Sequence, residues 1–135
     1  MKIAVVGATG LVGGVMLQVL EERGFANEEI IVAASAKSVG KKIAFAEREL
    51  VVVSVESAIE SNCDYAIFSA GGSTSKQYAP LFAEKGTIVI PTTMTEASAL
   101  CAGLSGSDFV IYTDGDFTET VCPTLGDIRP LMYVV

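Results

Sequence analysis

Three glycines spaced three residues apart, Gly7, Gly10 and Gly13, follow a short apolar run at residues 3–6. This pattern predicts a strand, a tight turn and a helix in direct succession. Gly7 would let the chain turn sharply, Gly10 would let backbone N–H groups approach a pyrophosphate, and Gly13 would let the helix pack closely on its strand. Glycines also occur in ordinary turns, but their place between strand and helix predicts a dinucleotide-binding site.

The composition indicates a single globular domain. Half of the 135 residues are hydrophobic, which is enough for a core and argues against disorder. The net charge of -7 and the lack of a basic stretch argue against nucleic acid and anionic membranes as partners. Residues 3–20 are uncharged, but four glycines interrupt them and no cleavage site follows, so we expect neither a membrane span nor a signal peptide, and a cytoplasmic location.

The cysteine and histidine content limits the chemistry available to the chain. The sequence has three cysteines, Cys63, Cys101 and Cys122, and no histidine. An odd number without C-x-x-C spacing fits neither a disulfide framework nor a zinc site, so we expect reduced, buried thiols. Without a histidine or a cationic cluster to activate a thiol, we assign no catalytic residue and no metal ligand.

Short apolar runs alternate with amphipathic segments along residues 1–90. This order predicts an α/β fold, a Rossmann-like doubly wound and mostly parallel sheet, in a single domain with a divergent C-terminal segment. We expect strands at residues 3–6, 30–34, 65–68 and 87–90, a hairpin at 42–46 and 49–53, a helix from residue 11 to Gly24, a second at 54–61 capped by Ser54, and a third ending at Gly86.

The spacing of apolar residues predicts which helix faces are buried. The first helix is expected to bury Leu11, Val12, Val15, Met16, Val19 and Leu20. Tyr78, Leu81 and Phe82 are expected to share one face of the third helix, with Pro80 in the first turn of its main part.

The chain changes character at Pro91. Residues 91–135 carry six acidic residues and a single cation, Arg129, and they end in an apolar run. Strands on either side of Asp114 and a solvated acidic turn, rather than a metal site, are expected there. We therefore divide the chain into a nucleotide-binding core at residues 1–90 and a divergent acidic tail at residues 91–135, which either completes the same domain or reflects truncation, a frame shift or engineering.

The end of the second predicted strand indicates which dinucleotide is bound. NAD-binding units usually place Asp or Glu there to hold the ribose 2′-hydroxyl, whereas this chain has Ser35, Lys37 and Ser38 and no acid. Two hydroxyls and a lysine can bind a 2′-phosphate through charge-assisted hydrogen bonds. The sequence therefore predicts NADP as the cofactor, and a solvated surface loop is the alternative.

A second turn of small residues, Ser69-Ala70-Gly71-Gly72-Ser73, follows the strand at residues 65–68. It lies at the carboxyl end of a strand, where open α/β sheets bind ligands. The turn is expected to pass under the pyrophosphate or the nicotinamide ribose. A simple turn with Ser73 as helix N-cap is a compatible alternative.

Three stretches together resemble the bacterial aspartate-semialdehyde dehydrogenases: MKIAVVGATGLVG at residues 1–13, ASAKSVGK at 34–41 and FSAGGS at 68–73. The resemblance covers about residues 1–90. It implies that Gly7, Ala8, Thr9, Gly10, Leu11, Val12 and Gly13 hold the pyrophosphate of NADP, that residues 35–38 hold its 2′-phosphate, and that residues 69–73 run beneath it. Lys37 stands where the family usually has arginine, which keeps the charge but loses the bidentate fork and weakens the NADP preference.

The resemblance implies an oxidoreductase of amino-acid biosynthesis that reduces β-aspartyl phosphate to aspartate semialdehyde with NADPH, and a homodimer. This chain lacks the family's Pro-Asn-Cys nucleophile motif, its catalytic histidine and its substrate-binding domain. The resemblance therefore implies the cofactor-binding domain of such an enzyme. A catalytically silent NADP-binding module is the alternative, and a related reductase acting on an N-acetylglutamyl phosphate fits residues 35–41 less well.

Overall fold

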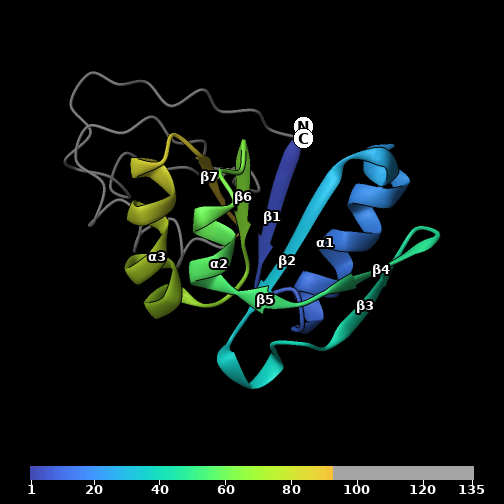
Figure 1. Cartoon of the computed structure of the whole chain (residues 1–135), viewed down its shortest axis with the longest axis horizontal. Helices are drawn as coiled ribbons and strands as arrows, with labels where there is room; N and C mark the ends of the chain where they lie inside the picture. Colours follow the sequence, from blue (N-terminus) through green and yellow to red (C-terminus); the bar gives the residue numbers. More distant parts are fainter. Residues whose placement is uncertain (93–135) are drawn as a thin grey trace, which may run out of the picture.

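The computed structural model describes residues 1–92, in which five parallel strands form the central sheet (Figure 1). The strands are β1 (Lys2–Val6), β2 (Glu29–Ala34), β5 (Val53–Ser54), β6 (Tyr65–Phe68) and β7 (Ile88–Pro91). Their order is β5-β2-β1-β6-β7, and every neighbouring pair is parallel. Since the winding direction reverses between β1 and β6, the predicted doubly wound α/β fold is confirmed.

Helices cover both faces of the sheet. The helix α1 (Leu11–Glu22) packs on one face together with the antiparallel hairpin of β3 (Lys42–Phe45) and β4 (Arg48–Val51). The helices α2 (Val55–Glu60) and α3 (Gly72–Glu84) pack on the opposite face. Two short 3₁₀ turns, η1 (Phe25–Asn27) and η2 (Ala36–Ser38), flank β2. The fold therefore has three layers, with the sheet in the middle, as Figure 1 shows.

The hairpin differs from the prediction in its second arm. We expected that arm to run through residue 53, but β4 ends at Val51 and the fully buried Val52 separates it from β5. In β5, Val53 pairs with Ala33 of the central sheet. The chain leaves the hairpin here because its next residues complete the edge of the parallel sheet. This connection places the start of α2 beside the end of β2.

The buried face of α1 agrees with the prediction at Leu20 and in the close packing of Gly13, but most of the predicted apolar stripe is exposed. The residues it buries are Gly13, Leu17 and Leu20, whereas Leu11 is 94% exposed and Val12, Val15 and Val19 are also exposed. Gly13 decides this orientation because it has no side chain, so the helix can approach the β1–α1 turn closely along that face. The helix therefore sits rotated relative to the expected apolar stripe, with Met16 partly buried at its border.

Two details of α3 also correct the prediction. Pro80 lies in the interior of the helix and not in a first turn, and Leu81 is 41% exposed while Ala79 and Phe82 are completely buried. The N-cap is Gly71 with φ +86°, so the alternative in which Ser73 is the N-cap is wrong. A left-handed backbone favours glycine, because L side chains rarely adopt it. The predicted ends at Gly24 and Gly86 are confirmed, since both glycines have positive φ just after a helix.

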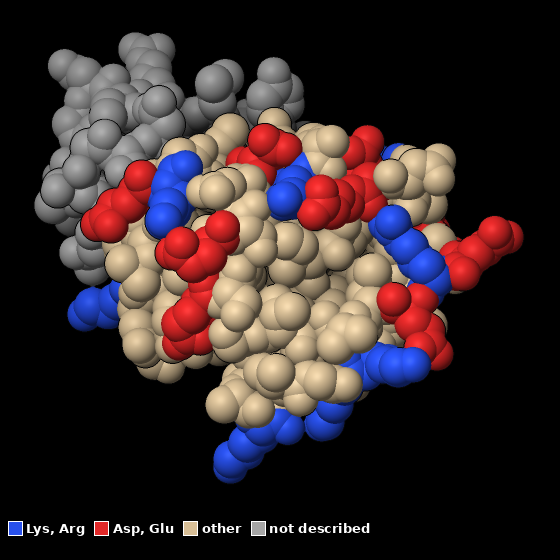
Figure 2. All heavy atoms as spheres, viewed as in Figure 1, with Lys and Arg blue, Asp and Glu red and all other residues tan. Residues whose placement is uncertain are grey.

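Charged side chains mark the edge of the sheet where its strands end. Figure 2 shows basic side chains at the margin where Figure 1 places the loop between β2 and β3. The lysines of this segment are Lys37, Lys41 and Lys42, and residues 35–42 contain no acid. Lys42 forms an ion pair with Glu49 at 2.8 Å, so the positive charge on the β2 side of this edge comes from Lys37 and Lys41.

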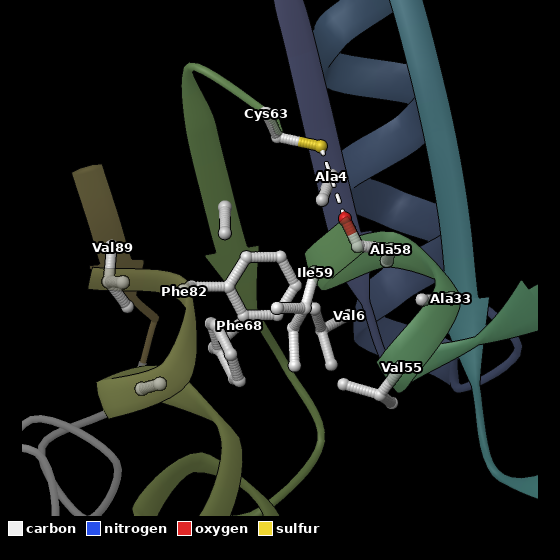
Figure 3. Close-up of a cluster of buried hydrophobic side chains, with 12 residues drawn as sticks. Ala4, Val6, Ala33, Val55, Ala58, Ile59, Cys63, Phe68, Phe82 and Val89 are labelled. Atoms are coloured by element: carbon white, nitrogen blue, oxygen red, sulfur yellow. Dashed lines mark hydrogen bonds between the residues drawn. The ribbon is translucent and has the colours of Figure 1, made fainter. Parts of the chain in front are cut away.

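The larger core lies between the sheet and the two helices α2 and α3 (Figure 3). Phe68 of β6 and Phe82 of α3 meet edge to face there, with ring centroids 5.6 Å apart and an interplanar angle of 89°. Cys63 is 4% exposed, and its Sγ donates to the carbonyl oxygen of Ala58 at 3.7 Å. Burial raises the pKa of the Cys63 thiol. The expectation of a buried thiol is thus confirmed for Cys63.

The end of the described region differs by one residue from the sequence boundary. We expected the last strand at residues 87–90, but β7 extends to Pro91, and Thr92 Oγ1 donates to the carbonyl oxygen of Phe68 at 2.8 Å. The expected strands and acidic turn near Asp114, together with Cys101 and Cys122, lie outside the described residues. Within residues 1–92, no helix is long and apolar enough to cross a membrane.

Candidate functional site

The turn after β1 packs against the turn after β6 through bare backbone. Gly7 has φ +92°, and a β-carbon built on it would lie 2.6 Å from the carbonyl carbon of Ser69. The N–H groups of Gly7 and Ala8 both donate to the carbonyl oxygen of Ala33, at 2.8 and 3.2 Å. Gly7 is therefore required by the packing of two turns on each other, and Ala8 is buried beneath them.

The first turn of α1 offers unused hydrogen-bond donors. The first helical hydrogen bond runs from Gly14 N–H to the carbonyl oxygen of Gly10 at 3.0 Å. The N–H groups of Leu11, Val12 and Gly13 consequently have no acceptor among residues 1–92. Together with the helix dipole, such donors suit a phosphate group. Leu11 and Val12 would thus contribute their backbone, because their side chains point into solvent.

The loop after β2 separates its three predicted residues. Ser35 and Lys37 are exposed, and Lys37 forms no ion pair with the described residues. Ser38 is only 8% exposed, and Thr9 Oγ1 donates to its Oγ at 3.5 Å. This bond connects the loop to the glycine turn. Ser38 therefore ties the two turns together, and Ser35 and Lys37 remain accessible.

A cavity of about 520 Å³ opens at the carboxyl ends of β1, β2 and β6. This volume lies within the range of small-molecule sites. The predicted residues that line it are Gly7, Thr9, Gly10, Ser35, Ser69 and Ala70. The predicted residues outside its lining are Ala8, Leu11, Val12, Gly13, Lys37, Ser38, Gly71, Gly72 and Ser73. The three predicted motifs therefore converge on one cavity, although not every residue of each motif faces it.

Sequence reasoning missed the wall of this cavity that α2 and α3 form. Glu56 of α2 and Tyr78 of α3 both line it, and Tyr78 Oη donates to Glu56 Oε1 at 2.7 Å. This hydrogen bond lowers the pKa of the Glu56 carboxyl and raises the pKa of the Tyr78 hydroxyl. We expected no acid at the end of the second strand, and none is there, but Glu56 enters the same cavity from the neighbouring β5–α2 connection.

A signal for Glu56 was present in the sequence. Its helix begins directly after a strand, and in a parallel sheet that junction lies at the ligand-binding edge. Ser54 accepts a hydrogen bond from Ser57 N–H at 3.2 Å and so fixes the start of α2. The predicted cap of Ser54 is confirmed. Placing Glu56 correctly also required the pairing of β5 with β2, which the local pattern did not contain.

No group of three or more His, Cys, Asp or Glu side chains within residues 1–92 is arranged to hold a metal ion. The only described cysteine, Cys63, is buried in the core and is not among the residues that line the cavity. The cavity and the adjoining first turn of α1 therefore combine backbone donors, small hydroxylated residues and one carboxylate. Such a set can bind a nucleotide.

Comparison with known proteins gives one consistent family. The family model described as "Semialdehyde dehydrogenase, NAD binding domain" matches residues 2–96. The aspartate-semialdehyde dehydrogenase of Corynebacterium glutamicum is 50% identical over 131 residues, covering 91% of this chain and 38% of the relative. That of Aquifex aeolicus is 47% identical over 90 residues, covering 66% of this chain and 26% of the relative. The chain therefore spans well under half the length of these relatives.

A solved structure agrees with these sequence matches. Aspartate semialdehyde dehydrogenase II from Vibrio cholerae superposes with a TM-score of 0.69 and 33% identity, over 82% of this chain and 37% of that one. The Corynebacterium match covers 91% of 135 residues and so extends beyond residue 92. Similarity to that relative thus continues past the stretch of about 90 residues in which the sequence motifs lie.

Proposed function

This chain belongs to the semialdehyde dehydrogenase family, whose NAD-binding domain it carries, and from that premise we propose that it binds NADP in the cavity at the carboxyl edge of the sheet. The observation that carries the proposal is the first turn of α1. Three backbone N–H groups without an acceptor in residues 1–92 point from it, beside Gly10, toward the strand ends. Donors in this arrangement fit a pyrophosphate.

Each motif has a distinct part in the proposed site. The N–H groups of Leu11, Val12 and Gly13 bind the pyrophosphate, and Gly10 keeps side-chain atoms out of its way. Ser35 and Lys37 bind the 2′-phosphate, and buried Ser38 holds the loop against Thr9. The Ser69-Ala70-Gly71-Gly72-Ser73 turn supports the cofactor from beneath, with Ser69 and Ala70 at the cavity surface. NADPH would supply a hydride when bound.

We also propose that the complete protein reduces β-aspartyl phosphate to aspartate semialdehyde, in amino-acid biosynthesis. The support is the family and the identity to dehydrogenases that carry this name. In this chain the described residues supply the proposed contacts to the cofactor, but none of them is a suitable nucleophile. Burial and a raised pKa make Cys63 a poor nucleophile, and the sequence has no histidine.

The inaccessible Cys63 favours a second candidate function for the chain by itself, a catalytically silent NADP-binding module. An assay for phosphate-dependent reduction of NADP by aspartate semialdehyde distinguishes a catalytic chain from a silent module. We expect no turnover by this chain alone. Turnover would show that residues 93–135 supply a nucleophile, and it would exclude the silent module.

Titration of the purified chain with NADPH and NADH tests the cofactor proposal. We expect tighter binding of NADPH, and we expect Lys37→Ala to reduce that preference by about 1 to 2 kcal/mol, the scale of a charge-assisted hydrogen bond. Lys85→Ala is the control, since it removes the same charge at the end of α3, in a residue that is not in the cavity lining. Equal affinity for both cofactors would contradict the 2′-phosphate assignment, and binding of neither would contradict the nucleotide site.

A further inference from the structure

Glu56 and Tyr78 form one wall of the proposed cofactor cavity from two different helices. Glu56 lies in the first turn of α2, and Tyr78 lies in the second turn of α3. The hydrogen bond of 2.7 Å from Tyr78 Oη to Glu56 Oε1 joins these helices across the cavity margin. The pair holds a carboxylate at a fixed place, and neither residue has a part in the phosphate contacts proposed above.

The sheet register places Glu56 on the side of the cavity where a nucleotide base would lie. Ala34 of β2 pairs with Ser54 of β5, so α2 begins directly beside the end of β2. In doubly wound sheets the pyrophosphate lies at the first turn and the adenosine ribose at the end of the second strand, here Ser35. The base extends from the ribose away from the pyrophosphate. In this sheet that direction leads toward β5 and the first turn of α2.

The surroundings of Glu56 suit a planar base. Val6, Ala34 and Val55 line the same cavity and are buried, so they give it an apolar floor. The floor is continuous with the carboxylate, because Val55 precedes Glu56 in the chain. Ligand sites commonly combine such apolar lining with a small number of polar groups that set orientation.

The chemistry of the carboxylate selects among bases. An ionised carboxylate only accepts hydrogen bonds, and it has about four lone-pair sites, so the bond from Tyr78 leaves room for a second donor. Adenine presents an exocyclic amine, whereas hypoxanthine and guanine present a carbonyl oxygen at the same position, which a carboxylate would repel. The hydrogen bond from Tyr78 lowers the pKa of the Glu56 carboxyl and so favours its ionised form.

We infer that Glu56 accepts a hydrogen bond from the exocyclic amine of the adenine base, and that Tyr78 is the positioning residue that holds the carboxylate for it. This inference rests on the proposed cofactor function and adds to it a contact that recognises the adenine base. Glu56 thereby selects adenine dinucleotides over those with a 6-oxo purine. The phosphate contacts alone give no such selection, because they do not touch the base.

Binding of NADPH and of its 6-deamino analogue to the full chain tests the inference. The analogue carries a carbonyl oxygen in place of the amine and is otherwise unchanged. We expect the unaltered chain to bind NADPH more tightly on the order of tenfold, the effect of one hydrogen bond to a charged group. In Glu56→Ala the two affinities should agree within about twofold on the same basis. Glu56→Gln and Tyr78→Phe should give intermediate ratios, because each leaves an acceptor at position 56 that is uncharged or less well held.

Glu60→Ala is the matched control. Glu60 is an exposed carboxylate on the same helix, it pairs with Lys85, and it is not in the cavity lining. This variant should keep the full preference for NADPH over the deamino analogue. A loss of preference in Glu60→Ala equal to that in Glu56→Ala would overturn the inference, since the effect would then come from the charge of α2 in general.

The remaining outcomes separate the inference from the function on which it rests. Tight binding of NADPH with equal affinity for the deamino analogue would overturn the inference alone. Glu56→Ala could instead change the preference for NADPH over NADH and leave the preference for NADPH over its deamino analogue unchanged. That result would also overturn the inference, because the carboxylate would then face the ribose. Failure of the unaltered chain to bind NADPH would overturn both.

Discussion

A β-carbon added to Gly13 would lie 2.7 Å from the α-carbon of Ala8. The first turn of α1 therefore rests directly on the backbone of the turn that precedes it. The contact is made by backbone atoms, and it sets how close the N–H groups that have no acceptor within residues 1–92 come to the strand ends. It also explains why Gly13, Leu17 and Leu20 form the buried face of α1.

Alanine substitutions at two adjacent glycines of α1 should have opposite effects. Gly13→Ala forces the helix away from the turn, and we expect it to destabilise the fold by about 1 to 3 kcal/mol, as overpacking does. Gly14→Ala meets no atom within 4 Å. It should stabilise the fold by about 1 kcal/mol because alanine favours a helix over glycine. Urea unfolding of both variants measures the difference, and equal stabilities would contradict the close packing.

The sequence was sufficient for the order and type of the elements but not for the orientation of α1. Strands such as residues 65–68 are short apolar runs between turn residues, so local pattern identifies them. In α1 the hydrophobic pattern counted Leu11 and Val15 as core because they are apolar, although the glycine motif already predicted close packing at Gly13. Packing reverses this, since the absence of a side chain at Gly13 allows the closest approach. A hydrophobic pattern does not register such a contact.

The candidate site shows the same division between local and non-local information. The glycine turn was identifiable because strand, turn and helix are consecutive in the chain. Glu56 was missed because it reaches the cavity only through the pairing of β5 with β2, which brings it near Ser35. Tyr78 was expected to share a face of the third helix with Leu81 and Phe82, but its hydrogen bond to Glu56 spans 22 residues of sequence. Such a contact follows from topology and not from spacing.

Neighbouring residues of α3 should differ strongly in their contribution to stability. Phe82 is completely buried and packs edge to face with Phe68, so Phe82→Ala should cost about 3 to 5 kcal/mol. Leu81 is 41% exposed, and Leu81→Ala should change stability by about 0.5 kcal/mol or less. Chemical denaturation gives both values. Similar losses in the two variants would show that Leu81 lies in the core, as its sequence pattern suggests.

Cys63 should be protected from alkylation in the folded chain. It is 4% exposed, and burial raises the pKa of its thiol, so the reactive thiolate is scarce and shielded. Iodoacetamide labelling followed by peptide mass spectrometry reports each cysteine separately. We expect the Cys63 peptide to react at least about tenfold more slowly in buffer than in denaturant, where the thiol titrates near its ordinary value of about 8.5. Equal rates would place this thiol at the surface.

The hydrogen bond between Tyr78 and Glu56 should give a contribution to stability that is confined to a pH window. It lowers the pKa of the Glu56 carboxyl, so its stabilisation is present above the ordinary glutamate pKa of about 4.3 and is lost as pH falls through the folded value. It raises the pKa of Tyr78, so its stabilisation is present below the ordinary tyrosine pKa of about 10 and is lost as pH rises through the folded value.

Thermal unfolding from acid to alkaline pH should therefore show Tyr78→Phe to be less stable than the unaltered chain near neutrality, with the difference shrinking toward both extremes. Tyr65→Phe, in β6, is the control, and its difference should not follow this window. A Tyr78→Phe difference that stays constant with pH would show that the hydrogen bond does not form in solution.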